Sequence, residues 1–201
     1  MNTREMDKLI EHFDTYFEQK DSTVLHSLIA EPHIDALLYP PSGKYPFWKL
    51  ATMGASDCKM NTPKGFIGDR NEYMMFIHPD EDMTDHETVS KYYNSLMEIA
   101  VYPISSGQFI SYGHSIEWRP EEGEEMVGAF LELPQMIDNV GILKCKLGLA
   151  KTAICLQAIL LTRSEMDELI KVGPEQFSNY LYPEDGSACH FISELHRSDK
   201  F

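Results

Sequence analysis

The first twenty residues carry apolar side chains at helical spacing. These side chains are Met6, Leu9, Ile10, Phe13 and Phe17. Acidic residues occupy other positions of the helical wheel, which is the pattern of an amphipathic helix with one buried face. We expect this helix to end near Lys20.

Longer apolar runs in the next part of the chain predict strands. Two β-prone runs flank the sequence PPSG between Tyr39 and Lys44, and these turn-forming residues predict a hairpin. Residues 71–79, NEYMMFIHP, are almost continuously apolar and end in proline. Such a run is typical of a strand buried on both faces, so we expect it at the centre of a sheet.

A helix should follow this central strand. Thr84 and Glu87 have the spacing of a capping box, and apolar residues then continue at helical period to about Val101. Beyond the helix, the β-like segments QFISYGHSIEW and VGAFLELP are separated by the acidic sequence RPEEGEEM. This arrangement predicts a second hairpin with an acidic loop.

The last third of the chain combines a strand with two short helices. The run TAICLQAILL at residues 152–161 is long enough for a buried strand. Thr162 and Glu165 have capping-box spacing and open a short helix that should end at Gly173. Pro174 suits the first turn of a further helix, because its missing N–H has no intrahelical partner there.

These elements predict the fold class α+β, with a mixed, mostly antiparallel β-sheet flanked by α-helices. The 201 residues fit a single domain. Residues 1–25 should hold the amino-terminal helix as part of that domain, and residues 26–182 the rest of it. Residues 183–201 are expected to form a mobile carboxy-terminal tail.

Charge narrows the classes of partner. The chain has 32 acidic and 17 basic residues, a formal net charge of −15. This charge would repel a nucleic acid and attract a basic protein, although it could serve solubility alone. Because no apolar run has the length of a signal peptide or a membrane span, we expect a cytoplasmic protein with no membrane partner.

Cysteine spacing argues against a disulfide framework or a zinc site. The four cysteines are scattered and form no CxxC pair. They are Cys58, Cys145, Cys155 and Cys189. We expect reduced thiols, no bound metal and no cofactor.

The sequence GASDC, residues 54–58, has a serine, an aspartate and a thiol beside a glycine. A hydrolase nucleophile elbow needs glycine on both sides of the serine and a helix after it, and neither condition is met. We therefore interpret GASDC as a structural turn. Gly54 would allow the sharp bend, while Ser56 and Asp57 would bind nearby backbone N–H groups.

Two surfaces or sites remain as hypotheses. An enzyme or metal site could assemble if the fold brings together His33, Asp35, Asp57 and His114, although a buried, hydrogen-bonded His33–Asp35 pair is the favoured interpretation of that motif. The acidic loop is a candidate partner-binding surface because it concentrates charge that a basic ligand would meet. Its glutamates are Glu117, Glu121, Glu122, Glu124 and Glu125.

The succession of motifs over residues 26–182 resembles the suppressor of fused family. The matching segments are His33-Ile34-Asp35, Pro40-Pro41, Thr52 to Ser56 with Met60, Glu72 to Ile77, and Tyr112 to Ile116. The order of these pieces is more specific than any one of them. The resemblance also covers the strand, acidic helix and glycine-linked helix near the carboxyl end.

This resemblance implies a non-catalytic α+β domain that works by binding a protein. Stand-alone members resemble bacterial proteins proposed as immunity proteins, so the implied partner is a basic toxin domain. Occlusion of the toxin could use the acidic loop or strand addition at a sheet edge. A regulatory scaffold for a non-toxin protein is the alternative within the same class.

Overall fold

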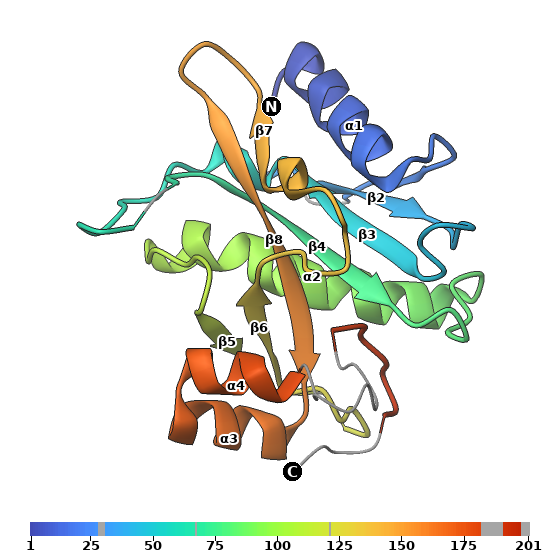
Figure 1. Ribbon diagram of the computed structural model, residues 1–201, viewed down its shortest axis with the longest axis vertical. Coiled ribbons are helices and arrows are strands. Elements are labelled where there is room, and N and C mark those ends of the chain that lie inside the picture. The colour runs from blue at the N-terminus through green and yellow to red at the C-terminus, as the bar shows by residue number, and fades with distance from the viewer. Residues whose placement is uncertain (28–30, 67, 121, 182–190, 198–201) are drawn as a thin grey trace.

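One mixed β-sheet organises the chain, as a computed structural model shows (Figure 1). The structure describes residues 1–27, 31–66, 68–120, 122–181 and 191–197. The helices are α1 (Thr3–Phe17), α2 (His86–Ser106), α3 (Arg163–Val172) and α4 (Pro174–Leu181). Short 3₁₀ turns, η1 and η2, span Ala55–Asp57 and Val140–Leu143.

The strands run in the order β1-β2-β3-β4-β8-β6-β5, with β7 pairing to β8. They are β1 (Thr23–Leu25), β2 (Asp35–Tyr39), β3 (Trp48–Met53), β4 (Asn71–Ile77), β5 (Ser115–Glu117), β6 (Gly128–Glu132), β7 (Lys144–Lys146) and β8 (Thr152–Leu161). Among these named strands, the β4–β8 pair is parallel and the other pairs are antiparallel. The predicted α+β class is confirmed.

Successive side chains of a strand point to opposite faces of the sheet, so the apolar core has a part on each face. Met75 and Leu156 belong to the cluster under α2, whereas Met74 and Cys155 belong to the cluster under α1. A third cluster lies beneath α3 and α4, near β6 and the end of β8. In Figure 1, α2 crosses the sheet while α1 and the α3–α4 pair lie near opposite ends of the molecule.

Most predicted elements form where the sequence pattern places them. The helix over residues 3–17, both hairpins, and the central and long strands are present. The capping box of Thr162 and Glu165 also forms, and α3 ends at Gly173. These elements have the long apolar periods or the cap residues that make local sequence decisive.

The ends of α2 differ from the prediction. Its N-cap is Asp85, whose carboxylate accepts the Thr88 N–H, whereas the Thr84 hydroxyl donates to Asp82 instead. The helix also continues past Val101 and through Pro103. It ends at Gly107, whose left-handed backbone (φ 69°) lets its N–H donate to the Pro103 carbonyl.

The carboxy-terminal segment that is described, residues 191–197, is not the mobile tail that the sequence suggested. Phe191 and Ser193 are fully buried, and Arg197 is nearly so. Ser193 pairs with Ile77 at the edge of the sheet core. The prediction fails here because these contacts are made with residues far away in the sequence. No helix in the described parts of the chain is long and apolar enough to cross a membrane.

Candidate partner-binding site

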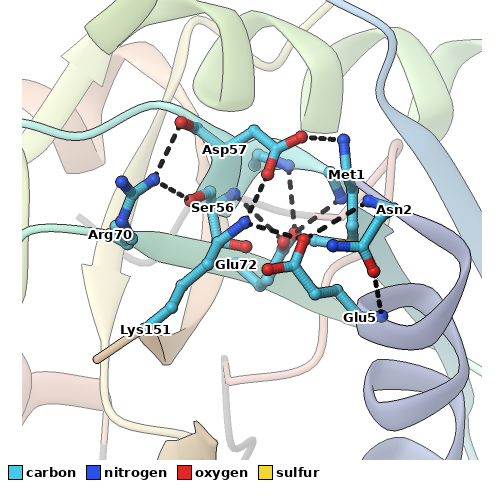
Figure 2. A network of polar contacts seen from close by, with 10 residues as sticks. Met1, Asn2, Glu5, Ser56, Asp57, Arg70, Glu72 and Lys151 are labelled. Carbon is cyan, nitrogen blue, oxygen red and sulfur yellow. Dashed lines mark hydrogen bonds and ion pairs between the residues drawn. The ribbon is translucent and has the colours of Figure 1, made fainter. Parts of the chain in front are cut away.

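The GASDC turn is organised around a buried carboxylate from the next strand (Figure 2). Glu72 lies on β4 and is fully buried. Its oxygens accept backbone N–H groups from Gly54 (3.1 Å), Ala55 (3.2 Å) and Ser56 (3.0 Å), and the Thr52 hydroxyl at 2.6 Å. Burial raises the pKa of Glu72, and these donors oppose that rise. The carboxylate therefore serves as the acceptor that closes the turn.

Close backbone packing explains why a glycine stands at the start of this turn. Gly54 has φ of 129°, and a Cβ there would lie 2.8 Å from the His33 carbonyl oxygen. On the other side of the turn, Arg70 donates to the Ser56 and Asp57 carbonyl oxygens at 2.8 Å each. The prediction of a tight turn at Gly54 is confirmed.

The Asp57 side chain connects the turn to distant segments rather than to nearby backbone N–H groups. Lys151, just before β8, donates to Asp57 at 2.5 Å and to Glu5 at 3.1 Å. Glu5 in turn closes the capping box of α1 with Asn2, and the Met1 amino group pairs with Asp57. We predicted that the Ser56 and Asp57 side chains would accept the backbone N–H groups of the turn. In the structure, the Glu72 carboxylate of β4 accepts those N–H groups instead.

Nothing in this turn is activated as a nucleophile. Ser56 is fully buried, and burial raises the pKa of the Cys58 thiol. Elsewhere, Cys155 lies 3.9 Å from the His12 ring, but burial raises the pKa of that thiol well above its ordinary value. Cys58, Cys145 and Cys155 are free thiols, whereas Cys189 lies outside the described residues.

His33 and Asp35 do contact each other, at the entrance to β2. The His33 Nε2 atom lies 3.4 Å from Asp35, and His26 approaches the other carboxylate oxygen at 3.3 Å. The Asp35 side chain is only 3% exposed, but that of His33 is 55% exposed. The expectation of a buried pair therefore fits Asp35 and does not fit His33.

His114 belongs to a different neighbourhood. Its Nδ1 contacts the Ser111 carbonyl at 3.0 Å, and its ring packs against Phe66 and Phe109. Of the four residues of the hypothetical enzyme site, His33 and Asp35 therefore lie together, whereas Asp57 and His114 each have other partners. Among the described residues, no group of three or more histidine, cysteine or acidic side chains could hold a metal ion. The geometry gives the enzyme or metal hypothesis no support.

The acidic loop connects β5 to β6 and is anchored near both ends. Glu117 forms an ion pair with Arg163 of α3 at 2.7 Å, and Glu125 lies 3.5 Å from His196. Between them, Glu122 is exposed. Glu124 lines a groove with Trp118, Arg119 and one side of α2, which we call the loop–α2 groove. Glu121 lies outside the described residues.

A second groove lies on the other side of α2, beside the edge strand β1. It has a volume of about 590 Å³ and we call it the β1–α2 groove. Sequence reasoning missed it, because β1 has only three residues and shows no period of its own. The two grooves share four lining residues, which are Ser90, Asn94, Met97 and Val101. The acidic loop and the β1 edge therefore border one continuous surface across α2.

The fold and these surfaces define a protein of the α+β class with two grooves that meet along α2. A model of the family described as suppressor of fused protein matches residues 30–193. The chain belongs to the suppressor of fused family. No curated protein matches the sequence.

Solved structures share this fold at low sequence identity. A suppressor of fused homologue from Neisseria gonorrhoeae FA 1090 is 12% identical with a TM-score of 0.70, and the alignment covers 98% of this chain and 97% of that one. The matching chain in the crystal structure of the Sufu–Fu complex is 14% identical with a TM-score of 0.65. That alignment covers 97% of this chain and 91% of the other. Drosophila Suppressor of Fused is 14% identical with a TM-score of 0.68. The alignment covers 98% of this chain but only 51% of the Drosophila chain.

Proposed function

We propose that the protein is a non-catalytic, cytoplasmic binding protein that neutralises a basic toxin domain, as an immunity protein does. Membership of the suppressor of fused family supports protein binding, since a relative with this fold was solved as a Sufu–Fu complex. The homologue from Neisseria gonorrhoeae shares the fold over 97% of its own chain, which supports a binding unit of this size. The net charge of −15 supports a basic partner.

The observation that carries the proposal is the anchored acidic loop. Glu117 forms an ion pair with Arg163 of α3, and Glu125 lies 3.5 Å from His196 of the carboxy-terminal segment, so both ends of the loop have a contact outside it. These contacts favour binding, because a loop that keeps its position loses less conformational freedom when a partner binds. Glu122 is exposed and Glu124 faces the loop–α2 groove, where a basic side chain of the partner would meet them.

A double charge reversal tests the role of the loop. In Glu122→Lys/Glu124→Lys, we expect affinity for the captured partner to fall by about tenfold or more, with a weaker dependence on salt. The matched control is Asp7→Lys/Glu11→Lys on the exposed side of α1, which changes the net charge by the same amount. Equal losses in both variants would show that overall charge matters and that the loop does not.

A growth assay separates an immunity protein from a regulatory scaffold. The captured partner is expressed alone and then together with the chain in the same bacterial cells. We expect growth arrest in the first case and recovery in the second. A partner that is harmless alone but still bound by the chain would reject the immunity role and retain protein binding.

A further inference from the structure

The hairpin formed by β7 and β8 differs in charge from the rest of this acidic protein. Residues 139–164 include no aspartate or glutamate, so all 32 acidic residues of the chain lie outside this stretch. The same stretch holds four of the 17 basic residues, which are Lys144, Lys146, Lys151 and Arg163. We call residues 144–154, which include the first three of these, the basic hairpin.

Two lysines of the basic hairpin are exposed and unpaired. Lys144 and Lys146 alternate with Cys145, which is buried in the core under α1, so both lysines point away from that core. Across the ladder they face Ile154 and Thr152, which carry no charge. Among the described residues, no carboxylate forms an ion pair with either lysine. Both charges are therefore available to an acidic ligand.

Exposed apolar side chains flank the two lysines. Leu149, at the tip of the hairpin, is 104% exposed, and Val140, in η2 just before β7, is 78% exposed. These are the two highest exposures among the large apolar side chains that the structure describes. Lysines alone would be typical of an edge strand that avoids pairing with other sheets, whereas exposed apolar groups favour association. The combination therefore indicates a binding surface.

The tip of the basic hairpin is held in place. The N–H groups of Leu147 and Gly148 both donate to the Lys151 carbonyl at 2.9 Å, which closes the turn. Lys8 of α1 donates to the Leu147 carbonyl at 2.7 Å, and the Lys151 ammonium contacts two carboxylates (Figure 2). These bonds fix the exposed residues without covering them, so less conformational freedom is lost when a ligand binds.

The basic hairpin is separate from the acidic loop. In Figure 1 the turn between β7 and β8 projects from the sheet beside α1, whereas α3 and α4 lie near the opposite end of the molecule. The acidic loop contacts α3 through Glu117 and Arg163. The hairpin is therefore a second surface, with the opposite charge.

The surroundings of the hairpin select among acidic ligands. Charge attraction is screened over about 8 Å at physiological salt, so the two lysines act locally. A membrane or a nucleic acid is an extended polyanion and would also face the acidic remainder of the molecule. A short protein segment would meet the hairpin alone. Its apolar side chains could also pack on Leu149, which offers nothing to a phosphate group.

We propose that the basic hairpin binds an acidic segment of a protein partner. Aspartate or glutamate side chains of the segment pair with Lys144 and Lys146, and its apolar side chains cover Leu149. This inference goes beyond the proposed function, because it assigns a second surface with a ligand of its own. It does not depend on the partner of the acidic loop being a toxin.

The probe is a capped hexapeptide of alternating aspartate and leucine, compared with one of alternating asparagine and leucine. Binding is followed by NMR on isotope-labelled protein. We expect the aspartate peptide to bind at least about tenfold more tightly, with an affinity that falls as salt increases. It should shift the signals of Lys144, Lys146 and Leu149 and leave those of α3 unchanged.

Charge reversal tests the role of the lysines. Lys144→Glu/Lys146→Glu should weaken binding of the aspartate peptide by about tenfold or more. The matched control is Lys20→Glu/Lys171→Glu, at exposed positions elsewhere, which changes the net charge by the same amount and should bind the peptide as well as the wild type does.

Removal of the apolar tip tests the second part of the surface. Leu149→Ser should weaken peptide binding by about fivefold, because an apolar contact is lost while the lysines remain. Ile170→Ser, at an exposed position on α3, is the control and should bind the peptide normally. Equal affinities of these two variants would overturn the role of Leu149.

The other outcomes decide the rest of the proposal. No binding of the aspartate peptide, equal binding of the asparagine peptide, or equal losses in the two charge-reversed variants would overturn it. Binding to phosphatidylglycerol vesicles or to a single-stranded oligonucleotide, without binding to the peptide, would also overturn it, because the ligand would then be a polyanion and not a protein segment.

Discussion

Glu72 is the residue on which the family motif around Gly54 depends. Four donors converge on its carboxylate, and three of them are backbone N–H groups of the turn. Buried N–H groups are costly when they have no acceptor, so this side chain stabilises the turn more than a surface glutamate could.

Replacing Glu72 with glutamine should destabilise the protein. The amide keeps the size of the side chain but turns one acceptor into a donor that faces other donors. We expect the free energy of unfolding to fall by about 2–4 kcal/mol, measured by urea denaturation. Glu11→Gln, on the exposed side of α1, is the control and should change little. Equal stability of the two variants would contradict the role given to Glu72.

Lys49 predicts a pH dependence of stability. It is fully buried on β3, and its ammonium donates to Gln19 at 2.8 Å. Burial lowers the pKa of Lys49 to about 8, although nearby Asp21 opposes the change. Between pH 8 and about 10, the unfolded chain therefore binds more protons than the folded one, and stability should rise with pH.

The measurement is the difference in unfolding free energy between wild type and Lys49→Met, from pH 7 to pH 10. The wild type should gain on the order of 2–3 kcal/mol relative to the variant across this range. Subtraction cancels groups such as Cys145, whose pKa burial raises to about 12. Lys20→Met, at an exposed position, should show no such trend. A constant difference for Lys49→Met would refute the effect.

Sequence could identify the turn at Gly54 but not the residue that stabilises it. The glycine and its polar neighbours indicate a bend from local chemistry alone. Glu72 is separated from the turn by a loop and arrives through the pairing of β3 with β4. For the same reason, the contact between His26 and Asp35 had no signal in the sequence.

At the scale of elements, the carboxy-terminal segment is the least expected part of the fold. Strands β4 and β8 pair only as far as Met74 and Gln157. Beyond that point, Ser193 takes the place beside β4, where its N–H donates to Phe76 at 2.7 Å and its carbonyl accepts from His78 at 3.0 Å. Residues 191–197 thus complete the sheet core between two diverging strands.

Arg197 should be important for holding this segment. Its guanidinium donates to the Leu160 carbonyl at 2.8 Å and forms an ion pair with Glu165, which is fully buried. Arg197→Met would leave that carboxylate without its cation, so we expect a loss of about 3–5 kcal/mol in unfolding free energy. Amide exchange of residues 191–197 should also become faster.

A double variant distinguishes loss of the ion pair from loss of packing. Glu165→Gln/Arg197→Met removes both charges but keeps a carbonyl for the Thr162 N–H, so it should recover part of the stability. Arg119→Met, at an exposed position in the acidic loop, serves as the control. If Arg197→Met is as stable as this control, the segment is held by its apolar contacts and the ion pair is dispensable.

Elements with strong local patterns could be predicted, and elements defined by pairing could not. The long helices and buried strands have clear apolar periods or caps, whereas β1 and β7 are only three residues long. The predicted end of α2 near Val101 was wrong, because the helix continues through Pro103 to Ser106, beyond the clear apolar period.

For the whole molecule, the class of fold followed from the succession of helices and strands, but the arrangement did not. Strand β8 lies between β4 and β6 and is parallel to β4, a long-range pairing without a local signature. The surface that joins the acidic loop to the β1 edge exists only because α2 crosses the sheet between them. The net charge of the protein follows from its composition, whereas the two grooves could be located only once the fold was known.

The proposed function requires this acidic protein, with its net charge of −15, to bind a basic partner. The most direct measurement is a calorimetric titration of the purified chain with the protein encoded by the neighbouring reading frame, at low and at high salt. We predict a one-to-one complex whose affinity falls as salt increases, because opposite charges attract the partners and salt screens them. Absence of a complex at both salt concentrations, or an affinity that does not depend on salt, would contradict this account.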